Sequence, residues 1–322
     1  MKNHLIRLLF LLLFVTQGLV AEEKTEASQE ETVAAEEEKE TYIKDLVEDY
    51  EESLGFFVTY RDPESNQIFL KVSKDQLKKE FIYFAHVING VASTGKVKGS
   101  YTDEGIFKIE KDFNKLRFSR VLTNYSFDDD NPLSKSKGAN ISDSTFQVVD
   151  ILAENEEENE YLIEITGLLL SETLTPILPI YSPEGPPPGF MWGQLSPIKS
   201  RVTGIFNYEE NTDFEVEYVI ESAPSYEYES EDVADPRNVN INLRYSFIEM
   251  PKNDFEPRLA NQSIGYFSER VTDLTSKDVT PYKDLIGKWN LKKKNPEEKI
   301  SEPNKPITIW ICHLYTSDAA DE

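Results

Sequence analysis

The clearest pattern of hydrophobic and polar positions lies at residues 239–247, where five apolar side chains alternate with four polar ones. Successive side chains of a β-strand point to opposite faces, so this period of two predicts a strand with one buried and one solvent-facing side. Similar alternation or short apolar runs predict further strands at residues 56–60, 67–72, 81–88, 105–109, 115–118, 146–154, 161–165, 201–208 and 214–220.

Turn-forming sequences separate many of these strands, as at residues 62–66, where Asp, Pro, Ser and Asn favour a tight turn. Helical spacing is confined to a helix at residues 44–53 and one helical turn at residues 73–78, with Ser73 as its cap. Many short strands at hairpin spacing with few helices predict a mainly β fold with minor α. The two expected forms are an antiparallel β-sandwich and curved β-sheets built from hairpins.

The first 21 residues have the pattern of a secretory signal peptide. Lys2 and Arg7 precede a short apolar core, and Ala21 offers a small residue for cleavage before Glu22. We therefore expect a secreted, periplasmic or cell-surface protein, with membrane contact only through an uncleaved signal peptide. Residues 22–43 have little apolar surface to bury and are predicted to form a disordered acidic linker.

Charge narrows the choice of partners. The net charge is −25, and residues 22–52, with 14 acidic and 3 basic side chains, contribute −11 of it. Proteins that bind nucleic acid face the phosphates with Lys and Arg, so no nucleic-acid partner is predicted. Solubility is the simpler explanation for an acidity of this kind.

The strand pattern changes after residue 247. Pro251 and Pro257 interrupt it, because proline cannot donate to a β-ladder. A Gly-Tyr-Phe sequence at residues 265–267 follows, then a charged stretch, predicted as helical, that ends near Trp289. An apolar strand is predicted at residues 306–311.

The order of these segments resembles the region just before the catalytic domain in large secreted bacterial zinc-dependent metalloproteases of the Met-zincin type. The resemblance covers roughly residues 42–311 and rests on a Pro-x-x-x-Phe-x-Pro-Arg sequence at 251–258, on Gly-Tyr-Phe, and on Trp-x-Leu-Lys at 289–292. The motif positions, none with a known role, are Pro257, Arg258, Gly265, Tyr266, Phe267 and Trp289.

Two positions depart from the family pattern. The Asp-Pro-Arg-Val run that usually precedes Gly-Tyr-Phe reads Asn-Gln-Ser-Ile at residues 261–264, and the arginine before the tryptophan is Lys288. Lysine lacks the planar bidentate donors of arginine, so any role that depends on those charges does not carry over.

The resemblance implies a non-catalytic, prodomain-like accessory region whose intramolecular partner is a missing catalytic domain. Zinc is expected in that domain alone. A zincin requires two histidines four residues apart on one helix, with a glutamate between them. His4, His86 and His313 have no such spacing, so no catalytic residue, metal site or cofactor is predicted in this chain.

The same resemblance sets the expected domain organisation. Residues 44–290 are the β-rich accessory region, either undivided or as subdomains 44–90 and 91–290, and residues 291–311 are the connector and first strand of the catalytic domain. Residues 312–322 resemble a translated sequencing adapter, which predicts a coding sequence cut after residue 311. A genuine short tail is the alternative.

Three further features are weaker candidates. Pro186, Phe190 and Trp192 lie in a proline-rich stretch that could serve as a recognition loop, with a surface loop packing its own aromatics as the alternative. The aspartates at 128–130 lack the spacing of a calcium loop and are expected to be solvated. His86 is expected to be a satisfied core histidine.

Two functions from different classes remain open. The first is the accessory region of a secreted metalloprotease, which would scaffold, shield or target the catalytic domain and meet its polypeptide substrate. The second is a free-standing exported binding module that holds a polypeptide or a glycan.

Overall fold

The computed structural model describes residues 42–139, 141–155, 157, 159–178, 192–222, 231–261 and 263–309. These residues belong to a unit that spans Glu40–Glu322. The predicted signal peptide with Ala21, residues 22–41 of the predicted linker, Pro186, Phe190 and the predicted tail at 312–322 lie outside them. No helix among the described residues is long and apolar enough to span a membrane.

Strands dominate the described residues. The helices are α1 (Ile43–Leu46), α2 (Thr166–Leu169) and the 3-10 helices η1 (Lys74–Gln76), η2 (Ala92–Thr94) and η3 (Pro132–Ser136). The first strands are β1 (Glu51–Ser53), β2 (Val58–Arg61), β3 (Ile68–Ser73), β4 (Glu80–Asn89), β5 (Tyr101–Asp112), β6 (Lys115–Arg120), β7 (Tyr125–Ser126) and β8 (Ser144–Asn155). The remaining strands are β9 (Glu160–Glu164), β10 (Gln194–Leu195), β11 (Arg201–Asn207), β12 (Asn211–Glu221), β13 (Asn238–Glu249), β14 (Ser268–Asp273) and β15 (Tyr282–Ile286).

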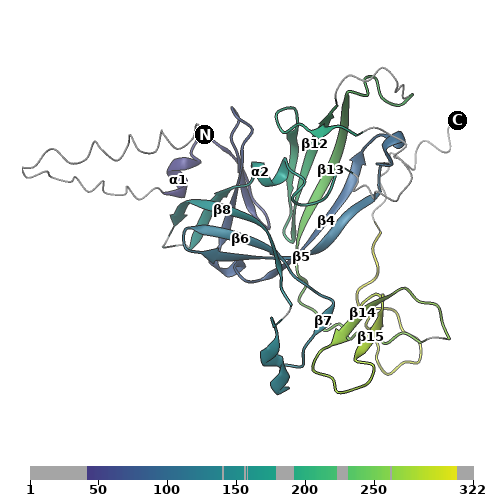
Figure 1. Cartoon of the computed structure of the whole chain (residues 1–322). Coiled ribbons are helices and arrows are strands. Elements are labelled where there is room, and N and C mark those ends of the chain that lie inside the picture. Colours follow the sequence, from purple (N-terminus) through teal and green to yellow (C-terminus); the bar gives the residue numbers. More distant parts are fainter. Residues whose placement is uncertain are drawn as a thin grey trace, which may run out of the picture. The chain divides into compact units, whose positions relative to one another are not determined.

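One large antiparallel sheet carries most of these strands. Within the described residues it has 12 strands in the order β1-β2-β3-β9-β8-β6-β5-β4-β13-β12-β10, and β11 also pairs with β12. Figure 1 shows the sheet curving strongly, with β6 and β8 on one limb and β4, β12 and β13 on the other. The prediction of a mainly β fold with curved antiparallel sheets is therefore confirmed.

The core lies on the inner face of this sheet. All five apolar residues of the 239–247 pattern are at most 1 % exposed, as the alternation in β13 predicted. The phenol of Tyr218 in β12 donates to the carbonyl of Leu169 at 2.5 Å and lies 2.8 Å from the hydroxyl of Tyr245. These bonds fix α2 against the inner face and satisfy polar groups that burial would otherwise leave costly.

The two ends of the sheet meet along a seam made largely by side chains. The side-chain Nδ2 of Asn207 in β11 donates to the backbone carbonyl of Ser53 in β1 at 2.8 Å and to the hydroxyl of Thr59 in β2 at 3.1 Å. Arg61 and Asn66 both donate to the carbonyl of Val202, at 3.1 and 3.2 Å. Among the strands that the structure describes, no backbone ladder joins the two ends of the sheet, so the seam closes it mainly through side chains.

Local predictions for the N-terminal half were mostly confirmed. The predicted hairpins appear as β2–β3, β5–β6 and β8–β9. The turn after Ser73 is η1, where Gln76 accepts from the Ser73 amide at 2.9 Å. The predicted helix at 44–53 was wrong beyond its first turn, because residues 51–53 pair with β2 as strand β1.

A small second sheet holds the C-terminal part. β14 pairs antiparallel with β15 and parallel with β7, which comes from the connection between β6 and β8. The prediction of a helix in the charged stretch was therefore wrong, since residues 268–273 and 282–286 are strands. The described part of the strand predicted at 306–311, residues 306–309, is not in a strand either.

Candidate functional site

The motif residues from 251 to 292 come together around β14 and β15. The Arg258 carbonyl accepts from the Ile286 amide at 2.9 Å, and the Phe267 carbonyl accepts from the Gly287 amide at 3.1 Å. The Lys288 ammonium lies 4.9 Å from the ring centre of Phe255, so the lysine found in place of arginine makes a cation–π contact. The three sequence segments that carry the resemblance thus form one spatial unit.

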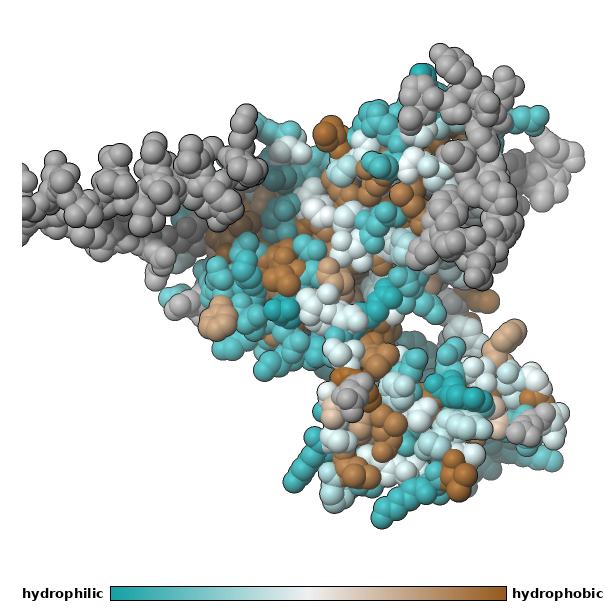
Figure 2. All heavy atoms as spheres, viewed as in Figure 1, coloured by the Kyte–Doolittle hydropathy of each residue, from teal (hydrophilic) through white to brown (hydrophobic). Residues whose placement is uncertain are grey.

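The side chains of this unit point largely to solvent. Phe267 is 99 % and Trp289 68 % exposed, although their backbones are hydrogen bonded. Figure 2 shows hydrophobic residues at the surface of this part of the molecule. We define the exposed motif residues as the large exposed apolar side chains that lie in the motifs or directly next to them. They are Leu259, Ile264, Tyr266, Phe267, Trp289 and Leu291, all at least 45 % exposed.

Three motif positions, Pro257, Arg258 and Gly265, are exposed. No atom lies within 4 Å of the position that a Cβ on Gly265 would occupy, so close approach does not require glycine there.

The other sequence candidates lie elsewhere. Trp192, the described member of the predicted recognition loop, is partly buried and packs against the main core. Asp128 takes part in a turn in which its carboxylate accepts from the Asp130 amide at 3.1 Å. Within the part of the chain that the structure describes, no group of three or more His, Cys, Asp and Glu side chains could hold a metal ion.

The prediction of a satisfied core histidine at position 86 was wrong. His86 lies on the outer face of β4, half-buried beside Arg244, and its Nδ1 is buried without a hydrogen-bond partner among the described residues. Burial and then the Arg244 charge lower the pKa of this imidazole, because both disfavour its charged form. The alternation of β4 puts even-numbered residues outward, which could have revealed this from the sequence.

A cavity of about 380 Å³ opens at one end of the inner face of the large sheet. We call it the mouth pocket. Arg120 of β6 pairs with Asp103 of β5 at 2.8 Å, and its guanidinium lies 4.9 Å from the ring centre of Tyr83 in β4. Phe146 of β8 and Glu172, which follows α2, also line the pocket.

Burial acts on both members of the charge pair in the mouth pocket. It raises the pKa of the Asp103 carboxyl and lowers the pKa of the Arg120 guanidinium, because desolvation disfavours the charged form of each. Sequence analysis missed this site. Asp103 and Arg120 are charged residues at the next inward positions after the apolar residues of β5 and β6, and this departure from the pattern is visible in the sequence.

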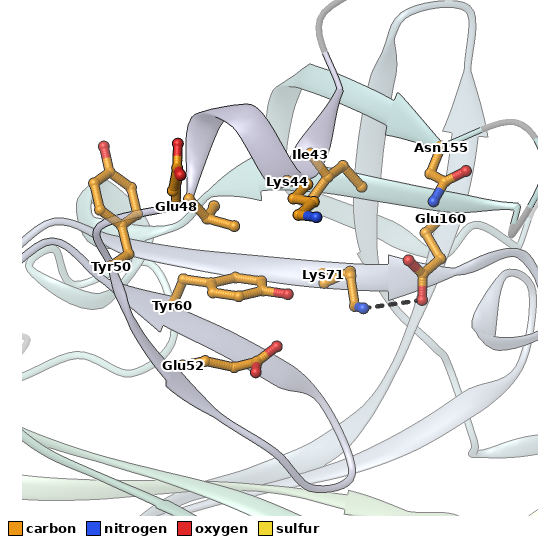
Figure 3. Close-up of a pocket in the computed structure, with 10 residues that line it drawn as sticks. Ile43, Lys44, Glu48, Tyr50, Glu52, Tyr60, Lys71, Asn155 and Glu160 are labelled. Carbon is orange, nitrogen blue, oxygen red and sulfur yellow. Dashed lines mark ion pairs between the residues drawn. The ribbon is translucent and has the colours of Figure 1, made fainter.

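A second cavity, of about 350 Å³, lies beside α1. Figure 3 shows it with the ion pair between Lys71 and Glu160, whose atoms are 3.1 Å apart. Its apolar wall is the small core where Ile43 of α1 and Val47, directly after α1, pack with Tyr60. We attribute this hollow to the seating of α1 on the outer face of the sheet, opposite the main core.

Comparison with known proteins gives one family. A family model described as a domain of unknown function, DUF5117, matches residues 99–294. The chain belongs to this family. The DUF5117 match takes in β5 to β15 together with the exposed motif residues. No curated protein and no solved structure matches the chain.

Proposed function

We propose that this DUF5117 chain is the non-catalytic N-terminal accessory region of a secreted zinc-dependent metalloprotease, and that it contacts the protease domain through its exposed motif residues. The observation that carries the proposal is the contrast within the motif unit between bonded backbones and exposed side chains. A motif that served folding alone would place Phe267 and Trp289 in a core.

The chemistry of these side chains suits a protein partner. Aromatic residues and leucine make up most of the set, and aromatic residues are enriched at protein interfaces. Exposed apolar residues gathered in one part of a protein commonly mark a surface for another protein. The resemblance of residues 251–292 to the segment before a catalytic domain supports a protease domain as that partner.

The proposal assigns the zinc chemistry to the protease domain. In that domain zinc would supply the activation of water for peptide hydrolysis, while this chain would position or shield the domain. The proposal also includes export through the N-terminal sequence. This chain's own residues contribute binding and supply no step of the hydrolysis.

A first experiment reads the genomic sequence past the codon for residue 311. We expect an open reading frame that encodes a helix with His-Glu-x-x-His. A stop codon within a few residues, with no such helix nearby, would refute the proposal.

A second experiment tests the contact itself. The protease domain, expressed separately, should bind this chain in titration calorimetry. Phe267→Ser and Trp289→Ser should each weaken binding by about tenfold or more, as expected for aromatic anchors. Val279→Ser is the matched control, because Val279 is equally exposed but lies outside the motifs. Equal losses in all three variants would show that the motif residues are not the contact.

A further inference from the structure

The mouth pocket is built from charged residues at positions that face the core. Inward-facing residues of β5 run from Ile109 and Phe107 through Gly105 to Asp103, and those of β6 end at Arg120. Each apolar series thus finishes with a charge at the same end of the sheet. Here the two charges pair with each other at 2.8 Å and stay partly exposed, so they form a polar rim that a ligand can reach.

Gly105 makes room for one wall of the pocket. A Cβ at this position would lie 2.8 Å from the ring of Tyr83, so any other residue would force that ring to shift. The Tyr83 hydroxyl is buried and has no hydrogen-bond partner among the described residues. The pocket therefore meets Tyr83 through its ring, against which the Arg120 guanidinium lies, and not through its buried hydroxyl.

The charged side chains of the pocket offer both hydrogen-bond donors and hydrogen-bond acceptors to a ligand. Within the described residues the Arg120 guanidinium makes one hydrogen bond, to Asp103, so further N–H donors are available to a ligand. One carboxylate oxygen of Glu172 accepts from the amides of residues 177 and 178, and its other oxygen accepts from none of the described groups. Asp103 accepts from Arg120 and from the following backbone amide, which leaves lone pairs on both oxygens.

The charges exclude strongly charged ligands. An anion that approached Arg120 would also meet the carboxylates of Asp103 and Glu172, and a cation drawn by those carboxylates would meet Arg120. A neutral ligand with both donors and acceptors avoids both conflicts. The volume of about 380 Å³ lies within the range of small-molecule sites, and the mouths of curled sheets are common places for them.

The backbone of the pocket argues against an extended peptide. β4, β5, β6 and β8 are interior strands, paired on both sides, so they offer no free ladder for strand addition. Recognition must therefore come from side chains. Sugar hydroxyls both donate and accept, and the carbon face of a sugar ring suits an apolar wall such as Phe146.

We propose that the mouth pocket binds one residue of a neutral saccharide. Arg120, Asp103 and Glu172 hydrogen bond to its hydroxyls, and Phe146 packs against its carbon face. This site is separate from the exposed motif residues, and it stands whether or not the chain serves a protease.

The test measures binding of the whole chain to neutral sugars. Galactose, mannose, N-acetylglucosamine and their oligosaccharides are screened by saturation-transfer NMR, and dissociation constants follow from titration. Arg120→Gln and Glu172→Gln should each weaken binding by about tenfold. Arg117→Gln is the matched control, because Arg117 lies on the same strand with its own carboxylate partner, Asp112, but outside the pocket. Circular dichroism establishes that each variant is folded.

The results that support the saccharide site differ from those that overturn it. Binding in the wild type and in R117Q, with a loss in R120Q and E172Q, supports the site. Oligosaccharides that bind more tightly than monosaccharides identify a glycan end as the source. Absence of binding to every sugar overturns the proposal. Equal binding in R120Q and R117Q also overturns it, as does Arg120-dependent binding of acetate, methylammonium or a tripeptide in place of sugars.

Discussion

The seam offers the sharpest test of how the curled sheet is held closed. In an Asn207→Ala variant, the Thr212 hydroxyl would lose the Asn207 oxygen that accepts from it at 2.5 Å, and the Thr59 hydroxyl would lose a donor 3.1 Å away. Both threonines are fully buried. Each buried polar group left unpaired costs about 1–3 kcal/mol, so we expect a loss of roughly 2–4 kcal/mol in the free energy of unfolding.

For a domain of this size, each kcal/mol lowers the melting temperature by about 2–4 °C, so a loss near 3 kcal/mol corresponds to roughly 6–12 °C. Guanidinium unfolding followed by tryptophan fluorescence measures the free energy, and calorimetry measures the melting temperature. Asn240→Ala is the control, because Asn240 is exposed on the outer face of β13 and makes no side-chain hydrogen bond within the described residues. An Asn207→Ala variant as stable as this control would refute the side-chain account of the seam.

Two further predictions concern pH and export. Burial raises the pKa of the Tyr218 and Tyr245 phenols above their usual value of about 10. The unfolded chain therefore releases these protons first as pH rises. The stability that these two tyrosines contribute is constant below about pH 10 and falls above it. Tyr218→Phe should flatten that decline in pH-dependent denaturant unfolding, whereas a change at the exposed Tyr208 should not. Export predicts that N-terminal sequencing of the secreted protein begins at Glu22, and a sequence beginning upstream of residue 18 would contradict cleavage after Ala21.

Sequence patterning predicted the large sheet well where local and tertiary preferences agree. The strict alternation of β13 is buried on one face, and the turn residues before β3 join a real hairpin. Agreement is expected there, because both the period of two and the turn chemistry act over a few residues.

Prediction failed where distant contacts decide the local structure. Residues 51–53 follow a helical turn but pair with β2, a choice set by the sheet edge and not by helical spacing. In the C-terminal part, Arg270 in β14 pairs with Asp284 in β15 at 2.7 Å across the strands. Charges spread along an exposed hairpin resemble the polar face of a helix, and only the register distinguishes them.

The mouth pocket could be predicted only in part. Asp103 and Arg120 violate the inward apolar pattern of their strands, which is a local signal. Their meeting with Tyr83 and Glu172 depends on the order of strands and on the path of the chain after α2, and neither follows from spacing.

The parallel pairing of β7 with β14 affects what a protease could do to this protein. The Thr272 amide donates to the Asn124 carbonyl at 2.9 Å, the Leu274 amide to the Ser126 carbonyl at 3.0 Å, and the Asp128 amide to the Thr275 hydroxyl at 3.0 Å. A cut in the exposed connection between β13 and Phe255 would break the chain without breaking these bonds. The two pieces would then remain joined as a nicked complex, much as a clipped propeptide stays with the protein it was cut from.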